Sequence, residues 1–484
     1  MIEVKNLGAP RLTAGFDRLR RIDRAGHRSI HGRMPRLTAT ELIEMAKEVD
    51  LRGRGGAAFP VARKMSAVYD NCRRRDQAPV VVVNATEGEP GSLKDKMLLT
   101  RAPHLVLDGA AVAAAALRAR EIVIGVTDSD AERSLLAAIN ERLHAGRDDQ
   151  PWARGAGGTR MIRMPERFVS GESGALVRGI NGEEPIPPGQ KVLAANRGVA
   201  GMPTYFSNAE TFAQIAILAS VGPEEYAAVG TGSEPGTVLL TVDGRRVVEA
   251  PAGVPLSAVL RACDASPGQG VLVGGYHGAW ISAEAASTTA VSREALTAAG
   301  GTLGAGIILP LRSDTCPLGE VAAVAGWLGE ESAGQCGPCR LGLPQLALAL
   351  SALAGGDQNA LSEVHRLVTM VRGRGACAHP DGTVRFVLSG LEVFADDVAI
   401  HAKKGTCGRP AKGVLPGVNT GASLQVDWSR CDGHGLCGHL IPGMVRLDPH
   451  GFPVLTRASV PEWLMPDARA AVEMCPALAL RLQS

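Results

Sequence analysis

Residues 78–145 alternate between short apolar runs and helical stretches, and this alternation constrains the fold of the chain more than any other feature. Four consecutive valines in APVVVVNATEGEPG (78–91) predict a buried strand that ends in a loop. The alanine-rich stretch 102–121 predicts a helix, because alanine has the highest helix propensity. A second buried strand, IVIGV (122–126), and another helix at 129–145 follow. This order predicts an α/β fold with a parallel sheet.

The 484 residues correspond to about three or four domains. After this region the predicted secondary structure and the composition change three times along the chain. From 236 the pattern predicts a β-hairpin that turns at Asp243-Gly244, then a helix and a further strand at 268–281. Helical patterns then run to about residue 400, and residues 405–423 hold five glycines, two prolines and no acid, which indicates a linker. The predicted organisation is an α/β domain (1–235), a small β-grasp-like domain (236–312), a helical domain (313–404), a linker (405–423) and a compact last domain (424–484).

Composition excludes several classes of function. The net charge of +2 offers no basis for nucleic-acid binding. No run approaches the roughly 18 apolar residues that a membrane span needs. The N-terminal stretch lacks the apolar region of a secretory signal, so we expect a cytoplasmic protein. In that compartment, the clustering of many of the ten cysteines favours metal or redox chemistry over structural disulfides.

One group of cysteines belongs to the predicted helical domain. Cys336 and Cys339 form a C-x2-C pair in ESAGQCGPCR (331–340), and Cys377 follows after two predicted helices. Such a pair is typical of half a zinc site, of a redox disulfide or of part of an iron–sulfur cluster, and these alternatives stay open at this stage. A structural zinc site needs four ligands, and His379 is the nearest candidate for the fourth.

The second group lies in the last 60 residues, where Cys431 and Cys437 precede a distant Cys475 that is followed by proline. A cysteine–proline pair after a tight cysteine run is typical of ferredoxins. His434 occupies the place where a four-cysteine site would have its second cysteine. Residues 424–484 resemble the small single-cluster ferredoxins that supply haem monooxygenases. That resemblance implies an α+β ferredoxin domain with a [3Fe-4S] cluster, or a [4Fe-4S] cluster where His434 supplies the fourth ligand.

Four upstream segments carry a second resemblance, which covers about 45–400. They are LRGRGGAAFPVARK (51–64), NATEGEPGSLKDK (84–96), SNAET (207–211) and ESAGQCGPCR (331–340). Together they resemble the NADH-binding flavoprotein subunit of respiratory complex I and its soluble hydrogenase and formate dehydrogenase relatives. The resemblance implies a Rossmann-like FMN- and nucleotide-binding domain, a β-grasp domain of the SLBB type and a helical iron–sulfur domain.

The chemistry of these segments suits a phosphorylated flavin. Glycine-rich loops bring backbone N–H groups close to a phosphate, and polar residues at the end of a buried strand lie where α/β sheets place ligands. The resemblance implies one pocket for FMN, with NADH or NADPH stacked on the flavin. Its predicted residues are Gly53, Arg54, Gly55, Gly56, Lys64, Asn84, Glu87, Glu89, Gly171, Glu172, Asn208 and Thr211.

The chain departs from the family pattern at several positions. Ala333 replaces one of the four usual cluster cysteines, which leaves His379, a [3Fe-4S] cluster or an empty site. Cys316 lies at the far end of a predicted helix about 20 Å long, too distant to substitute. On the nucleotide side, Thr86, Phe168 and Ser173 replace an aspartate, a tyrosine and a glutamate, and the phenylalanines expected between 183 and 200 are missing; Lys191 and Arg197 stand there instead. The donor is therefore open between NADH, NADPH and a protein.

These features lead to three hypotheses. The favoured one is an NAD(P)H-dependent oxidoreductase that passes electrons through FMN, a cluster in the helical domain and a ferredoxin cluster to a partner such as a haem monooxygenase. The second is a non-catalytic electron-transfer subunit of a larger dehydrogenase complex. The third is a structural zinc-binding adaptor. The remaining thiols, Cys72, Cys263 and Cys407, receive no predicted role.

Overall fold

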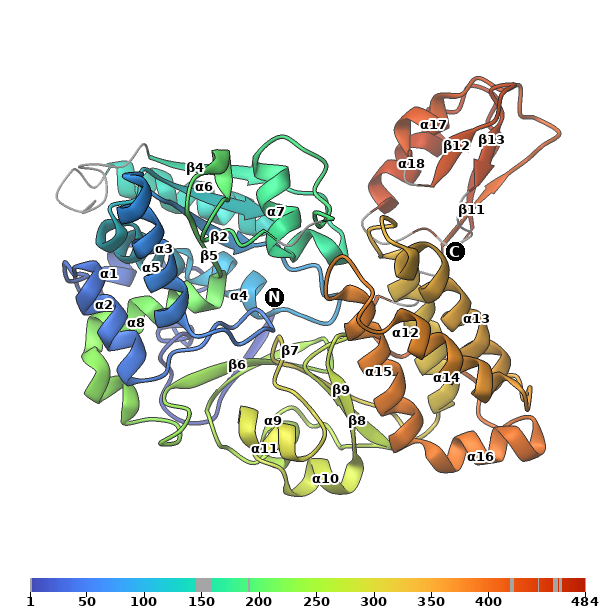
Figure 1. Cartoon of the computed structure of the whole chain (residues 1–484), viewed down its shortest axis with the longest axis horizontal. Coiled ribbons are helices and arrows are strands. Elements are labelled where there is room, and N and C mark those ends of the chain that lie inside the picture. The colour runs from blue at the N-terminus through green and yellow to red at the C-terminus, as the bar shows by residue number, and fades with distance from the viewer. Residues whose placement is uncertain are drawn as a thin grey trace. The chain divides into compact units, whose positions relative to one another are not determined.

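The structure is a computed structural model, and it describes residues 2–144, 158–189, 192–417, 422–442, 444–455, 460 and 464–483. Lys191 lies outside the described residues. The chain divides into two compact units, Met1–Lys412 and Gly413–Ser484. Figure 1 labels many of their elements, and each unit is described by itself below. No helix in the described part of the chain is long and apolar enough to cross a membrane.

A four-stranded parallel sheet forms the centre of the first unit, as the alternating pattern predicts. Its order is β4-β3-β2-β5, with β2 at Val80–Ala85, β3 at Glu121–Val126, β4 at Thr159–Arg163 and β5 at Thr204–Asn208. All six residues of β2 are buried, because both faces of the sheet are covered. Val81 and Val83 pack with α5 and α8 in the main core, whereas Val80 and Val82 pack with Leu176 of α7 on the opposite face.

Eight helices accompany this sheet in the described residues. They are α1 (Arg24–His31), α2 (Ala39–Glu48), α3 (Val61–Arg75), α4 (Lys94–Arg101), α5 (Pro103–Leu117), α6 (Ser129–His144), α7 (Ser173–Ile180) and α8 (Ala209–Ala227). Gly109 lets α5 approach α8 closely, because a Cβ there would lie 1.7 Å from the carbonyl oxygen of Phe212. The predicted α/β class is confirmed.

A second sheet of mixed direction has the order β1-β7-β6-β10-β8-β9. Its strands are β1 (Glu3–Asn6), β6 (Thr237–Val242), β7 (Arg246–Pro251), β8 (Gly270–Val273), β9 (Ala279–Ser282) and β10 (Ile307–Pro310). The hairpin β6–β7 turns at Asp243-Gly244 as predicted, and the short helices α9 (Leu256–Ala262), α10 (Ala283–Thr288) and α11 (Arg293–Ala298) follow. Two features differ from the prediction. The segment 268–281 contains two antiparallel strands, and β1 joins this sheet although the sequence pattern assigns residues 1–235 to the first domain.

Helices fill the rest of the first unit, as predicted. They are α12 (Pro317–Glu330), α13 (Leu343–Ala354), α14 (Ala360–Val371), α15 (His379–Val393) and α16 (Ala395–Lys404), with one π-helical turn at Pro338–Gly342. Residues 405–412, predicted as the start of the linker, belong to this unit. Their backbone is held there, because the Cys316 N–H donates to the Pro410 carbonyl at 3.0 Å and the Lys412 N–H donates to Glu320 at 2.7 Å.

The second unit is small and of the α+β type. Strands β11 (Ser423–Val426) and β14 (Leu480–Gln483) pair antiparallel, as do β12 (Val445–Leu447) and β13 (Pro453–Leu455). Helices α17 (Leu436–Leu440) and α18 (Met465–Glu473) pack with these strands around a separate apolar core that includes Ile441 and Met444. This arrangement agrees with the predicted ferredoxin-like domain.

Candidate functional site: a flavin edge and two thiolate sites

The carboxyl edge of the parallel sheet brings distant polar residues together. Asn84 near the end of β2 is paired in register with Asn208, the last residue of β5. Asn208 also caps α8, because its side chain accepts a hydrogen bond from the Glu210 N–H at 3.0 Å. Parallel strands place their carboxyl ends at one edge, which is where open α/β sheets bind ligands.

The glycine-rich loop lies against the start of α8. The Gly53 N–H donates to the Phe59 carbonyl at 3.0 Å, which closes the loop, and the Arg54 N–H donates to Thr211 Oγ1 at 2.9 Å. A Cβ at Gly55 would lie 3.2 Å from the Cβ of Asn208, so a larger residue would separate the loop from the sheet edge. Gly56 has a φ of +99°, a conformation that favours glycine.

The segment around Gly171 approaches the same edge from the other side. Asn84 Nδ2 donates to the Gly171 carbonyl at 2.9 Å, and a Cβ at Gly171 would lie 3.3 Å from the Thr86 carbonyl. Thr86 Oγ1 donates to Asn84 Oδ1 at 2.5 Å, which fixes the orientation of that amide. Glu172 caps α7, since its carboxylate accepts from Gly174 N at 2.8 Å. Direct contacts therefore join three of the four predicted segments (51–64, 84–96 and 207–211) and the Gly171 loop.

Lys64 provides a partly shielded positive charge beside this surface. It lies on α3, and its Nζ donates to the Phe206 carbonyl at 3.1 Å and lies 5.9 Å from the ring centre of Phe59. Burial lowers the pKa of Lys64. Within the described residues, no carboxylate forms an ion pair with this ammonium group. A cation whose protein partner is a neutral carbonyl, next to a glycine-rich loop, fits the phosphate of FMN.

A buried ion network lies directly beneath the edge, and no local sequence pattern indicates it. The Nζ of Lys94 lies 3.0 Å from Asp95 Oδ1 and 3.0 Å from Glu210 Oε2. Asp95 in turn accepts a hydrogen bond from Asn208 Nδ2. Burial alone would lower the pKa of Lys94, but the two carboxylates outweigh it and raise that pKa. The network ties α4 to the start of α8 and so positions Asn208.

Glu87 and Glu89 follow β2, and each already has a backbone partner. Glu87 accepts hydrogen bonds from Asp95 N at 3.3 Å and Lys96 N at 2.9 Å at the start of α4. Glu89 accepts from Tyr276 N at 3.0 Å, so it links this domain to the turn between β8 and β9. Burial, together with the charge of Asp95, raises the pKa of Glu87 to about 7, and burial raises the pKa of Glu89 to about 8.

The raised pKa of Glu89 predicts a pH dependence of stability. In the folded protein Glu89 keeps its proton up to about pH 8, whereas its ordinary pKa is 4.5. Between these values the folded state binds more protons than the unfolded state, so the free energy of unfolding falls as pH rises. We expect Glu89→Gln to stabilise the protein at pH 8 by on the order of 2 kcal/mol relative to wild type, with little change at pH 4.5.

Thermal melts from pH 4.5 to 8.5 on flavin-stripped protein measure this effect. Glu284→Gln is the control, because Glu284 is exposed on α10. The same pH slope in Glu89→Gln and wild type would show that Glu89 is ionised in the folded state.

The first cysteine group gathers at the π-helical turn before α13. Cys336 Sγ and Cys339 Sγ are 3.6 Å apart, and Cys377 lies close enough to raise the pKa of Cys339. Burial is the largest cause, ahead of Cys336 and then Cys377, and together these raise the pKa of Cys339 to about 12, so iron binding would release a proton from this thiol. A π-helical turn at this point is in keeping with the frequent use of such turns at functional sites.

The geometry does not favour His379 as the fourth ligand. Its Nε2 lies 2.8 Å from the Leu328 carbonyl, and its Nδ1 lies 3.0 Å from Nε2 of His277. Both ring nitrogens are thus engaged away from the cysteines. The sequence could not show this, because His277 belongs to the turn after β8, about 100 residues upstream, and meets α15 only in the folded unit.

The cluster loop (residues 331–340) contacts the segment 167–171, which leads to Gly171 at the carboxyl edge of the parallel sheet. Arg167 Nη2 donates to the Ser332 carbonyl at 3.1 Å, and the Phe168 N–H donates to Glu331 Oε2 at 3.2 Å. The negative charge of Glu172 contributes to raising the pKa of Cys377, after burial as the main cause. The predicted flavin residues and the predicted cluster ligands are therefore neighbours within one unit.

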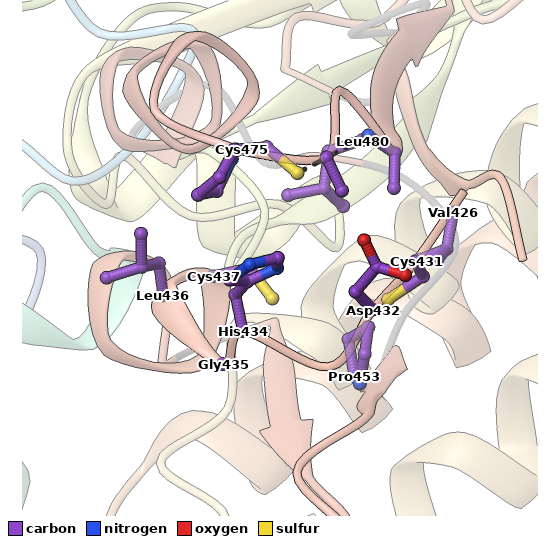
Figure 2. Close-up of a pocket in the computed structure, with 13 residues that line it drawn as sticks. Val426, Cys431, Asp432, His434, Gly435, Leu436, Cys437, Pro453, Cys475 and Leu480 are labelled. Atoms are coloured by element: carbon purple, nitrogen blue, oxygen red, sulfur yellow. Dashed lines mark hydrogen bonds between the residues drawn. The ribbon is translucent and has the colours of Figure 1, made fainter.

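The second cysteine group lines a hollow of about 370 Å³ in the C-terminal unit, a volume that includes the part open to solvent. Figure 2 shows Cys475 above this hollow, Cys437 and His434 on one side, and Cys431 on the other. Cys437 lies in the first turn of α17, and Cys475 follows α18 and accepts a hydrogen bond from Ala479 N at 3.3 Å. Three thiols and one imidazole around one hollow are a donor set that fits an iron–sulfur cluster.

Comparison with known families agrees with this arrangement. Residues 46–217 match the Nuo51 FMN-binding domain, and residues 320–401 match the NADH-ubiquinone oxidoreductase-F iron-sulfur binding region. Residues 424–482 match the 4Fe-4S single cluster domain.

Related proteins share most of the length of the chain. The F 2 subunit of the NADH-quinone oxidoreductase of Rhizobium meliloti (strain 1021) is 27% identical over 79% of this chain and 93% of its own. The NADP-reducing hydrogenase subunit HndC of Solidesulfovibrio fructosivorans is 27% identical over 84% of both chains.

Solved structures show the same fold. A chain of the NAD+-reducing [NiFe]-hydrogenase in the air-oxidized state has a TM-score of 0.68 and 25% identity, covering 82% of this chain and 67% of that one. Over most of its length the chain is thus similar to the F subunits of NADH-quinone oxidoreductases and to related hydrogenase subunits, and its C-terminal region matches the 4Fe-4S single cluster domain.

Proposed function

We propose that the chain is an electron-transfer flavoprotein that oxidises NADH or NADPH and delivers electrons through two iron–sulfur clusters to a redox partner. The observation that carries this proposal is the contact between the cluster loop and the segment that leads to Gly171 of the predicted flavin site, through Arg167 with Ser332 and Phe168 with Glu331. FMN, when bound, supplies the exchange between a two-electron donor and one-electron acceptors.

The residues of the chain would divide this work. The loop at Gly53, Gly55 and Gly56 would present backbone N–H groups to the phosphate, and Lys64 would neutralise part of its charge. Asn84, held by Thr86, would meet the flavin ring, and Glu172 lies close enough to Cys377 to raise the pKa of that thiol. Cys336, Cys339 and Cys377 would hold a cluster with one ligand fewer than usual, because Ala333 stands at the fourth position.

The C-terminal unit would act as a fused ferredoxin. Cys431, Cys437 and Cys475 would hold its cluster, with His434 as the candidate for the fourth ligand of a [4Fe-4S] centre. Attachment to the same chain raises the effective concentration of this carrier to the mM range. We propose a functional division into nucleotide and flavin binding at 1–235, the β-grasp domain at 236–312, the first cluster at 313–404 and the second at 424–484.

The acceptor is a second protein in this proposal. A haem monooxygenase corresponds to the resemblance of the C-terminal domain, and a larger dehydrogenase complex corresponds to the names of the relatives, which are subunits of quinone oxidoreductases and hydrogenases. The relatives include both NADH- and NADP-linked proteins, so the nucleotide is decided by experiment.

An anaerobic titration tests the proposal. We expect NADH or NADPH to bleach a flavin absorbance band in the purified full chain and then to generate cluster signals in electron paramagnetic resonance. Dithionite serves as the control that reduces every centre regardless of the nucleotide site. A preparation reconstituted with FMN, iron and sulfide that still shows neither flavin nor cluster would contradict the proposal.

One observation favours the second candidate, a relay subunit that takes electrons from another protein. Phe168 replaces the family's tyrosine, and its ring packs edge-on against Trp327, His277 and His379, with centroids 5.4, 4.7 and 5.5 Å away. A ring committed to this cluster is less free to position a nicotinamide. Reduction of flavin and clusters by dithionite but by neither nucleotide would establish the relay.

A further inference from the structure

A third group of metal-ligating side chains lies apart from both predicted cluster sites. Cys316, His401 and Cys407 place one sulfur, one ring nitrogen and one sulfur within 4.8 Å of one another. We propose that these three residues bind a zinc ion that fastens the C-terminal end of the first unit. The inference does not depend on the proposed electron-transfer function.

Each ligand comes from a different structural position. Cys316 is the N-cap of α12, His401 lies in the last turn of α16, and Cys407 follows that helix. Gly405, with a φ of +78°, ends α16 and turns the chain so that Cys407 comes back toward His401. The spacing of 85 residues between Cys316 and His401 explains why no sequence motif reveals the site.

The distances suit a tetrahedral ion. Cys316 Sγ lies 3.4 Å from His401 Nε2. Zinc–sulfur and zinc–nitrogen bonds of about 2.3 and 2.0 Å at tetrahedral angles place the two ligand atoms about 3.5 Å apart. The Cys407 N–H donates to the same Nε2 at 3.3 Å, so this nitrogen is the unprotonated one, and zinc would replace this hydrogen bond at its lone pair.

Burial and hydrogen bonds from neighbouring groups hold the ligands in place. Cys316 and His401 are 3% and 2% exposed, and Cys316 Sγ accepts a hydrogen bond from Gly319 N at 3.4 Å. Cys407 is half-buried, which leaves an approach from solvent. Within the described residues the group has three members, so water would complete the tetrahedron, as in zinc sites with three protein ligands.

A ligand set of two sulfurs and one imidazole favours zinc over the other common metal ions. Thiolate and imidazole ligands at tetrahedral spacing favour zinc over magnesium or calcium, which prefer oxygen. Binding would release one proton from each thiol to solvent and would involve no electron transfer. The alternative, a disulfide between Cys316 and Cys407, would give His401 no role although its Nε2 lies close to both residues.

A zinc ion at this site would restrain residues 405–412, which form the C-terminal tail of the first unit. Residues 405–412 already contact α12 through the Cys316 N–H to Pro410 and the Lys412 N–H to Glu320. The ion would add a bond between the start of α12, the end of α16 and this tail. It would thereby fix the point from which the chain leaves the first unit.

Metal analysis of the full chain, purified without a metal-affinity column, tests the proposal. We expect about one zinc per chain in wild type, and less than about one-tenth of that in Cys407→Ala and His401→Ala, with iron and flavin contents unchanged. Cys72→Ala is the matched control, because Cys72 is another half-buried thiol in the same unit. X-ray absorption at the zinc edge should show two sulfur neighbours and one nitrogen neighbour from the protein.

Several results would overturn the proposal. Zinc that is missing from wild type, or that persists in Cys407→Ala, excludes the site. Iron in place of zinc, lost in the same variants, would make it a third iron centre. A cross-linked peptide joining Cys316 and Cys407 after non-reducing digestion would make it a disulfide. Because Cys407 is half-buried, its alanine variant should fold, and an unchanged circular dichroism spectrum verifies this point.

Discussion

Lys94→Met should lower the free energy of unfolding of the α/β domain by about 3–5 kcal/mol. The substitution removes the positive charge between Asp95 and Glu210, whose side chains are 6% and 1% exposed, and leaves two carboxylates buried without it. Breaking one partner of a buried ion group is costly, because the remaining charges keep their desolvation penalty and lose their attraction. Asn208 would also lose its fixed position, so flavin affinity should fall together with stability.

Lys96→Met is the matched control, two residues further along the same helix. The Lys96 ammonium pairs with Asp128 but is 38% exposed, so its loss should cost no more than about 1 kcal/mol. Thermal unfolding, followed by the release of flavin, compares the stability of the α/β domain in the two variants. Equal effects of the two substitutions would contradict the view that the buried network supports the site. Lys94→Met combined with Asp95→Asn and Glu210→Gln should recover part of the loss.

Cys437→Ala should remove the C-terminal cluster and lower electron delivery to a protein acceptor such as cytochrome c by about 100-fold or more. Cys437 is 8% exposed at the start of α17 and lines the same hollow as Cys431 and Cys475. Two remaining thiols cannot close a cluster site of this kind. The prediction rests on the proposed function, in which this cluster is the exit for electrons.

Assays with two electron acceptors distinguish the loss of the C-terminal cluster from general damage to the protein. Reduction of ferricyanide, which takes electrons directly from a reduced flavin, should stay within about twofold of wild type, because the first unit has its own core. Cys263→Ala is the control, since Cys263 is a fully buried thiol in the apolar core of the six-stranded sheet. Iron content and paramagnetic signals equal to those of wild type would show that Cys437 is not a ligand.

Much of the candidate site could be predicted from local sequence patterns. Four valines followed by Asn84 indicate a buried strand with a polar end, and parallel strands bring such ends to one edge. The spacing of the thiols identifies two sets, and three of these thiols do line one hollow. The ligand roles of these residues remain predictions, since a spacing defines which groups can meet but not what they bind.

Other features depend on contacts between residues far apart in the chain. Strand β1 pairs with β7 across 243 positions, as the ion pair of Glu3 with Arg246 illustrates, and four residues of strand pattern cannot specify such a partner. His379 is a reasonable ligand candidate beside Cys377 in the sequence, but His277 and the Leu328 carbonyl engage both of its nitrogens.

Local patterns in the chain are enough to predict the α/β class and to separate the two cysteine groups, because periodicity and spacing are properties of short segments. Long-range packing, in contrast, buries Lys94 between two carboxylates and brings Cys316, His401 and Cys407 to one point. Burial and metal geometry depend on which helices pack together, and this packing is set by the whole core rather than by any short segment.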